Sequence, residues 1–150
     1  MSDAEDRAAA GSPAVDTAES VDNQAVLRMF RDDLASGKLG IELISAGHGT
    51  ATVTMTVRDT MVNGHAIGHG GYVFLLADTA FACACNTYGP VTVAASADIT
   101  FIAPVHAGDK LTAHAVERAK WGRSGIYDIT VRNDKGVVAE FRGNSRTIGR

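Results

Sequence analysis

One acidic side chain, Asp78, stands within a run of apolar and small residues and is the first candidate for chemistry. Between Val73 and Cys85, only Asp78 and Thr79 are neither apolar nor small. A carboxylate is costly to bury unless it is paired or hydrogen-bonded. Asp78 is therefore either an acid that takes part in catalysis or one that only caps or hydrogen-bonds the neighbouring backbone.

The residues just before this run, His69, Gly70 and Gly71, have the properties of a site for a negative or polarised oxygen. Glycines at the start of a helix let another group approach the backbone closely. The first helical turn also leaves N–H groups free at the positive end of the helix dipole, and this favours an anion. The sequence thus predicts an oxyanion-type donor set at the head of one helix and a lone acid farther along it.

The spacing of the two features indicates that they act in different copies of the chain. Gly70 and Asp78 are eight residues apart, which is roughly 12 Å along a helix at about 1.5 Å per residue. Because catalytic contacts need about 3 Å, one small reacting group does not touch both. We infer two antiparallel helices in a two-fold dimer, so that the head of one helix faces the acid of the other.

The helix that carries both features is expected to be the centre of a soluble core. A helix that is apolar on every side is a buried helix, and this one is shorter than the ~20 apolar residues that cross a bilayer. The chain of 150 residues has the length of one ordinary domain. Its 45% hydrophobic and 21% charged residues are typical of a globular protein.

Charge and cysteine content limit the partners that we expect. A net charge of −3 gives no reason to expect nucleic acid, and neither a membrane span nor a signal peptide is visible. Cys83 and Cys85 lie two residues apart on the expected helix, where they point to different faces. They are interpreted as reduced core residues of a cytoplasmic protein. No third cysteine or helical histidine stands at ligand spacing, so we expect neither a metal nor another cofactor.

The other elements are predicted from composition and periodicity. Residues 1–20, rich in Ala, Ser and Asp, are expected to be a disordered tail, and residues 21–150 the folded domain. Ala25, Val26, Met29, Phe30 and Leu34 are spaced for one face of an N-terminal helix that ends near Lys38 and Gly40. Strands are expected from residue 41, over 50–57, 91–101, 110–120, 126–132 and 137–147, and a turn over 121–125. The expected fold is α+β, an antiparallel sheet of about six strands wrapped around one long central helix.

These motifs resemble the hotdog-fold acyl-CoA thioesterases, in particular the phenylacetyl-CoA thioesterases of the PaaI type. The resemblance covers roughly residues 25 to 149, and its spacing of His-Gly-Gly and Leu-Ala-Asp is fairly specific. The matching residues are Asn63-Gly64-His65, His69-Gly70-Gly71, Phe74, Leu76 to Ala82, Ala84-Cys85-Asn86, Gly108-Asp109, Gly125, Tyr127-Asp128-Ile129, Phe141-Arg142-Gly143, Ser145 and Ile148-Gly149.

The resemblance implies roles for individual residues. Asp78 falls on the catalytic acid, which acts as a nucleophile or as a general base for water, and Gly70 on the backbone N–H that polarises the thioester carbonyl. His69 and Asn63 fall on polar positions near that carbonyl. The residues alone leave alternatives open, in which His69 orients a loop or bonds the backbone and Asn63 forms an Asx turn. The family also implies homodimers with shared sites, usually paired into homotetramers.

Three further residues are candidates for binding the substrate. Gly71 belongs to the glycine pair at the helix head. Arg123 and Ser124 lie in an expected tight turn, where an arginine suits the phosphates of coenzyme A. The alternative for this turn is an ordinary solvated hairpin.

The function predicted first is hydrolysis of an arylacetyl-CoA or hydroxyarylacetyl-CoA. A hotdog-fold hydratase or dehydratase is the second candidate, and it places a histidine and an acid differently on the central helix. A non-catalytic acyl-CoA-binding module is the third, and it would have no need of Asp78.

Overall fold

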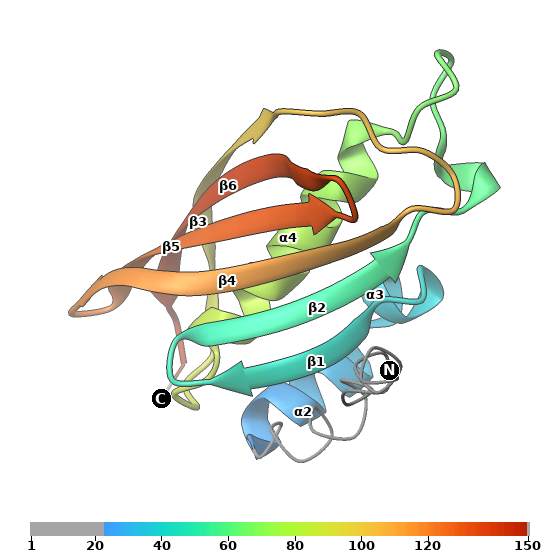
Figure 1. Ribbon diagram of the computed structural model, residues 1–150. Coiled ribbons are helices and arrows are strands. Elements are labelled where there is room, and N and C mark those ends of the chain that lie inside the picture. The colour runs from blue at the N-terminus through green and yellow to red at the C-terminus, as the bar shows by residue number, and fades with distance from the viewer. Residues whose placement is uncertain (1–22, 150) are drawn as a thin grey trace, which may run out of the picture.

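The computed structural model describes residues 23–149, so the expected tail of residues 1–20 lies outside the described part, as do residues 21, 22 and 150 of the expected domain. One six-stranded antiparallel sheet curves around the central helix α4 (Figure 1). The strand order is β1-β2-β4-β5-β6-β3. The elements are α2 (Gln24–Asp32), α3 (Leu34–Lys38), β1 (Glu42–Gly47), β2 (Thr50–Thr56), η1 (Asp59–Met61), α4 (Gly70–Cys85), β3 (Thr92–Phe101), β4 (Lys110–Trp121), β5 (Ser124–Asn133) and β6 (Gly136–Thr147). This is the α+β arrangement that the sequence predicts.

Helix α4 is buried on most of its surface, as its apolar sequence predicts. Leu76, Ala80 and Phe81 are at most 1% exposed, and the ring of Phe81 packs beside that of Tyr127 on β5. The sheet and the N-terminal helices leave one stripe of α4 incompletely covered. This stripe is formed by Gly71, Leu75, Asp78 and Ala82, which recur at the spacing of one helical face.

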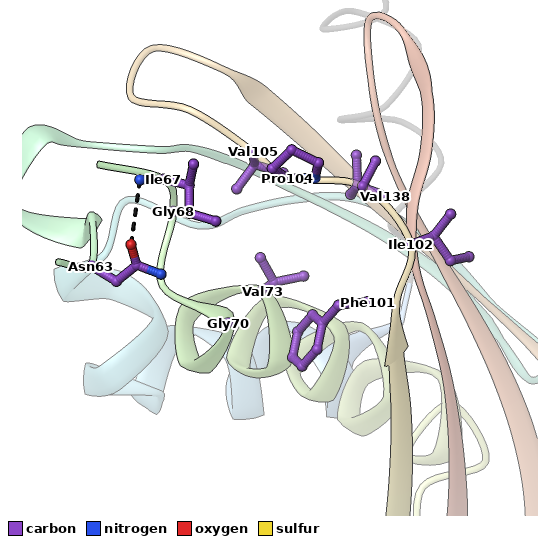
Figure 2. Close-up of a pocket in the computed structure, with 11 residues that line it drawn as sticks. Asn63, Ile67, Gly68, Gly70, Val73, Phe101, Ile102, Pro104, Val105 and Val138 are labelled. Carbon is purple, nitrogen blue, oxygen red and sulfur yellow. Dashed lines mark hydrogen bonds between the residues drawn. The ribbon is translucent and has the colours of Figure 1, made fainter. Parts of the chain in front are cut away.

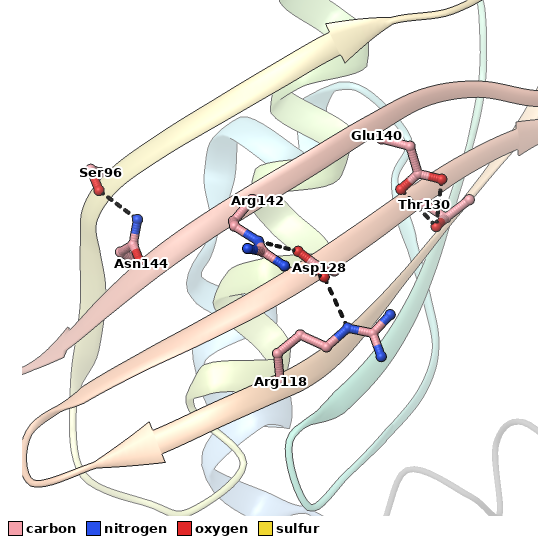
Figure 3. A network of polar contacts seen from close by, with 7 residues as sticks. All are labelled: Ser96, Arg118, Asp128, Thr130, Glu140, Arg142 and Asn144. Carbon is pink, nitrogen blue, oxygen red and sulfur yellow. Dashed lines mark hydrogen bonds and ion pairs between the residues drawn. The ribbon is translucent and has the colours of Figure 1, made fainter.

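The strands alternate between a face that packs on α4 and a polar outer face. In β5 every second residue from Gly125 to Val131 is buried, and Figure 3 shows polar side chains on the face opposite α4. There Arg118 and Arg142 both donate hydrogen bonds to Asp128. The Arg142 bond, followed by that of Arg118, holds the pKa of Asp128 below its usual range.

Strand β3 forms one edge of the sheet, and β1 forms the other. Strand β3 pairs with β6 alone, and all its residues except Thr92 and Ile99 are exposed. Five of the nine strongly exposed large apolar side chains in the described chain lie on β3 or next to its ends: Val91, Val93, Phe101, Ile102 and Ile148. A long apolar edge strand offers unpaired backbone groups to another chain.

The expected N-terminal helix is present as α2, but its expected continuation to Lys38 is wrong, because the chain breaks at Asp33 and a second short helix, α3, follows. The backbone of Asp33 is extended, with φ −79° and ψ 90°, and its side chain accepts a hydrogen bond from the Ser36 N–H. Asp33 thereby caps the N-terminus of α3, a position that favours aspartate. As a result Leu34, expected on the buried face, is 82% exposed.

The expected turn over 121–125 is shorter in the structure, since Ser124 is the first residue of β5 and pairs with Trp121. Within residues 23–149, no helix is both long enough and apolar enough to cross a membrane.

Candidate active site

The head of α4 is shaped by His69, which is the N-cap residue of the helix. Its Nδ1 accepts a hydrogen bond of 2.9 Å from the Gly71 N–H. This bond assigns the proton of a neutral imidazole to Nε2. The bond to the backbone that was left open as an alternative for His69 is therefore present in the structure. It engages one of the N–H donors of the first turn.

Gly70, by contrast, has an N–H with no hydrogen-bond acceptor among residues 23–149. It lines a pocket of about 450 Å³ together with Asn63, Val73 and Phe101 (Figure 2). A Cβ at this position would lie 2.9 Å from the Phe101 ring. Because Gly70 has no side chain, its free N–H and the ring of Phe101 can lie next to each other in the pocket.

Asn63 faces the same pocket from the loop before α4. Its Oδ1 accepts a hydrogen bond of 2.9 Å from the N–H of His65. It accepts a second one, of 3.4 Å, from the N–H of Ile67 (Figure 2). The Asx turn expected as an alternative is thus present. The Asn63 Nδ2 makes no hydrogen bond with another described residue, so it remains a second free donor beside Gly70.

Asp78 is half-buried, and its carboxylate has no hydrogen-bond or ion-pair partner in the described chain. Within residues 23–149 it does not cap or bond neighbouring backbone. It faces a separate pocket of about 660 Å³, formed by α2, α4 and the start of β3. Burial raises the pKa of Asp78, and the negative charge of Asp33 raises it further.

A single chain does not bring Gly70 and Asp78 together. They line two different pockets and are separated by roughly 12 Å along α4. Asp78 belongs to the incompletely covered stripe of α4, whereas Gly70 faces the pocket walled by Phe101. In the single chain, the pocket with the free Gly70 N–H therefore lacks the acid, and the pocket with the Asp78 carboxylate lacks the Gly70 donor.

Residues 65–140, half of the chain, match the sequence profile of the Thioesterase superfamily. This chain belongs to the thioesterase superfamily. An acyl-coenzyme A thioesterase, PaaI, of Escherichia coli (strain K12) is 48% identical over 122 residues, which cover 81% of this chain and 87% of that protein.

Two solved structures are similar to this thioesterase over most of its length. The E. coli PaaI protein from the phenylacetic acid degradation operon has a TM-score of 0.80 and 44% identity, covering 91% of this chain and 94% of its own. A mutant of phenylacetic acid degradation protein PaaI from Thermus thermophilus has a TM-score of 0.75 and 34% identity, covering 77% and 100%. The expected hotdog thioesterase fold and the assignment as a thioester hydrolase are confirmed.

The predicted substrate-binding residues of this thioesterase do not line the Gly70 pocket of their own chain. Gly71 faces a shallow pocket beside Tyr72 and Leu75. Arg123 is exposed in the turn between β4 and β5. That turn lies at the end of the sheet away from the head of α4 (Figure 1). The 12 residues of β4, at about 3.3 Å each, span roughly 40 Å. Arg123 and Ser124 therefore do not reach the Gly70 pocket of their own chain.

Two residues of these pockets were not among the sequence candidates. The sequence predicts only that Phe101 ends a strand, and no sequence signal places its ring over Gly70. Asp33 was assigned to a continuous helix, although an acid followed by Ser36 at the N3 position is a recognisable cap pattern. Among the described residues, no group of three or more His, Cys, Asp or Glu side chains is arranged to hold a metal ion.

Proposed function

We propose that this thioesterase hydrolyses arylacetyl-CoA, such as phenylacetyl-CoA or hydroxyphenylacetyl-CoA, to the free acid and coenzyme A. The substrate class is supported by the similarity to PaaI proteins of phenylacetic acid degradation. The observation that carries the proposal is the pair of unpartnered groups on one helix, the Gly70 N–H and the Asp78 carboxylate. An enzyme of this class needs both a donor for the carbonyl oxygen and a group that attacks or activates water.

The active site is completed by a second copy of the chain. The uncovered stripe of α4 includes Asp78, and the apolar side chains on and beside β3 extend the surface available to a partner. Pairing of two β3 edges, with the two α4 helices antiparallel, would cover both surfaces and bring Asp78 of one protomer to Gly70 of the other. We propose a homodimer with two shared sites, paired further into a homotetramer.

In this site the thioester oxygen accepts hydrogen bonds from the Gly70 N–H and the Asn63 Nδ2. Asp78 of the second protomer then acts in one of two ways. Its carboxylate attacks the carbonyl carbon, which expels the coenzyme A thiolate and leaves an anhydride that water opens. Alternatively it takes a proton from a water molecule as that water attacks. In both routes the N–H donors stabilise the oxyanion of the tetrahedral intermediate, and each donor contributes about 3 kcal/mol.

The remaining predicted residues have supporting parts. His69 holds the helix head through its bond to Gly71, and the absence of a Gly71 side chain leaves room for the substrate. Arg123 and Ser124 are proposed to meet the nucleotide phosphates of a substrate bound at another protomer. We place the activity in the cytoplasm, because both cysteines are free and buried, as in a reducing compartment.

Substitution of Asp78 by asparagine tests the proposal. We expect kcat for phenylacetyl-CoA to fall by about 100- to 10,000-fold, the range for loss of a general base, while KM changes little. Release of the coenzyme A thiol measures the rate, with Asp134→Asn on the exposed β5–β6 turn as the matched control. An Asp78→Asn enzyme as fast as the wild type would exclude the role of Asp78.

The two chemical routes are separated by a single turnover in ¹⁸O-labelled water. If the carboxylate attacks and water opens the anhydride at the Asp78 carbonyl, label enters Asp78 and a proteolytic peptide that contains Asp78 gains mass. Label in Asp78 therefore excludes a pure general-base route. General-base catalysis places the label in the product acid alone.

A further inference from the structure

Asp33 lies in the break between α2 and α3, and its carboxylate is held in a fixed position. Its Oδ1 accepts the Ser36 N–H at 3.0 Å, and its Oδ2 contacts the Ser36 hydroxyl at 2.5 Å. A carboxylate with two such bonds to one turn has little freedom to rotate away from its surroundings.

A hydroxyl bridge ties this turn to the central helix next to Asp78. The Ser36 Oγ lies 2.9 Å from the Oγ1 of Thr79, which also contacts the Leu75 carbonyl oxygen at 3.0 Å. Ser36 and Thr79 are only 1% and 6% exposed. Because Thr79 directly follows Asp78, this bridge fixes Asp33 relative to the residue that carries the proposed reactive carboxylate.

Asp33 and Asp78 also face the same pocket of about 660 Å³. The other charged or titratable side chains that line it are Arg28 and Asp32 from α2 and Cys85 from α4. Strand β3 contributes Thr92, Val93 and Ala94, none of which carries a charge. Asp32 is largely exposed and lies near Arg31, so Asp33 is the acid that is fixed at the buried side of this pocket.

We propose that Asp33 is a positioning residue whose fixed carboxylate, in the pocket that it shares with Asp78, sets the pH at which the enzyme becomes active. This inference rests on the proposed role of Asp78 as base or nucleophile. Asp33 lies on a different element from Asp78. Neither the sequence analysis nor the similarity to known thioesterases gives it a role.

The physical basis is repulsion between two like charges in a partly desolvated pocket. Burial is the larger cause of the raised pKa of Asp78, and Asp33 is the second. A like charge nearby disfavours ionisation, so removal of the Asp33 charge lowers the pKa of Asp78. A carboxylate with a higher pKa is a stronger proton acceptor, which suits catalysis near neutral pH. The consequence is that a smaller fraction of Asp78 is ionised at acidic pH.

The test is Asp33→Asn, which keeps an oxygen for the Ser36 N–H because asparagine caps helices as well as aspartate does. The pH profile of kcat/KM for phenylacetyl-CoA should shift its acid limb to lower pH. Below the wild-type midpoint, the rate relative to the plateau should rise by about twofold or more. Asp32→Asn removes the same charge from the adjacent exposed position and should leave the acid limb in place.

A ¹³C NMR titration of the Asp78 carboxyl gives a readout that does not depend on catalysis. The signal is assigned by its loss in Asp78→Asn, and its midpoint should move to lower pH in Asp33→Asn. An unchanged midpoint in a folded Asp33→Asn protein overturns the inference, as does an equal shift in Asp32→Asn. If Asp78→Asn stays active while the NMR shift occurs, the proposed function fails but the coupling of the two acids stands.

Discussion

At the scale of single residues, Gly70 and Asp78 are exceptions in a chain that pairs its buried polar side chains. No fully buried side-chain nitrogen or oxygen in residues 23–149 lacks a hydrogen-bond partner. Against this background, the free Gly70 N–H and the unpartnered Asp78 carboxylate, together with the Asn63 Nδ2, are groups left available to a substrate. Groups of this kind are retained at functional sites at a cost in stability.

The carboxylate of Asp78 is expected to destabilise the folded protein at neutral pH. Its folded pKa is raised from 3.8, mainly by burial, so ionisation favours the unfolded chain above that value. Asp78→Asn should therefore have a higher midpoint of urea denaturation than the wild type at pH 7. The difference should shrink as the pH falls towards 3.8 and below it, where the carboxyl becomes protonated in both states. A variant that is less stable than wild type at pH 7 would contradict this prediction.

Gly70 is expected to be required for activity rather than for folding. In Gly70→Ala the new methyl group would meet the Phe101 ring at 2.9 Å, and this half-exposed ring can move aside. We expect kcat/KM to fall roughly 100-fold, as for a misplacement of about 1 Å at a reacting centre. The free energy of unfolding should change by less than about 1 kcal/mol. Gly37→Ala, where a Cβ meets nothing within 4 Å, is the control and should retain full activity.

At the scale of elements, the contact between α4 and β6 fixes how closely the sheet wraps the helix. A Cβ at Gly143 of β6 would lie 2.8 Å from the ring of Phe81, which is 1% exposed and packs against the rings of Tyr127 and Phe141. We expect Gly143→Ala to lower the free energy of unfolding by about 1–3 kcal/mol through overpacking, as measured by urea denaturation. Gly47→Ala at the end of β1, with open space around its Cβ, should cost much less.

At the scale of the whole molecule, the proposed active site depends on the proposed assembly through β3. Ala97 pairs with Gly143 of β6, and directly opposed residues share a face of the sheet. Ala97 therefore lies on the α4 side of the sheet, yet it is exposed in the single chain. It marks the surface where we place the second protomer.

Ala97→Glu is expected to weaken the dimer and to lower activity in parallel. An unpaired buried charge costs about 3 kcal/mol or more, which corresponds to a loss of roughly 100-fold in dimer affinity. Light scattering after size exclusion measures the mass, and the thiol-release assay measures the rate. Thr56→Glu on the exposed side of β2 should change neither. A monomeric Ala97→Glu enzyme with full activity would show that the site does not need a second protomer.

The sequence predicted well the features that depend on local periodicity. The apolar run from Val73 to Cys85 predicted α4, and the alternation of threonine with apolar residues over 50–57 predicted β2. Side chains that repeat with the period of a helix or a strand indicate which face is buried. The secondary structure of each such segment can therefore be predicted from that segment alone. The break at Asp33 was missed because the apolar spacing continues across it and outweighed the cap at that position.

By itself, the sequence determined the family, the fold class and the two groups on α4, since a lone acid and a glycine pair are visible wherever the chain places them. Only the tertiary structure decided that the ring of Phe101 stands over Gly70, that Asp33 shares a pocket with Asp78, and that Arg123 lies at the far end of the sheet. The physical reason is that these relations join segments distant in the chain, and they are set by the packing of helices and strands rather than by the spacing of residues within one segment.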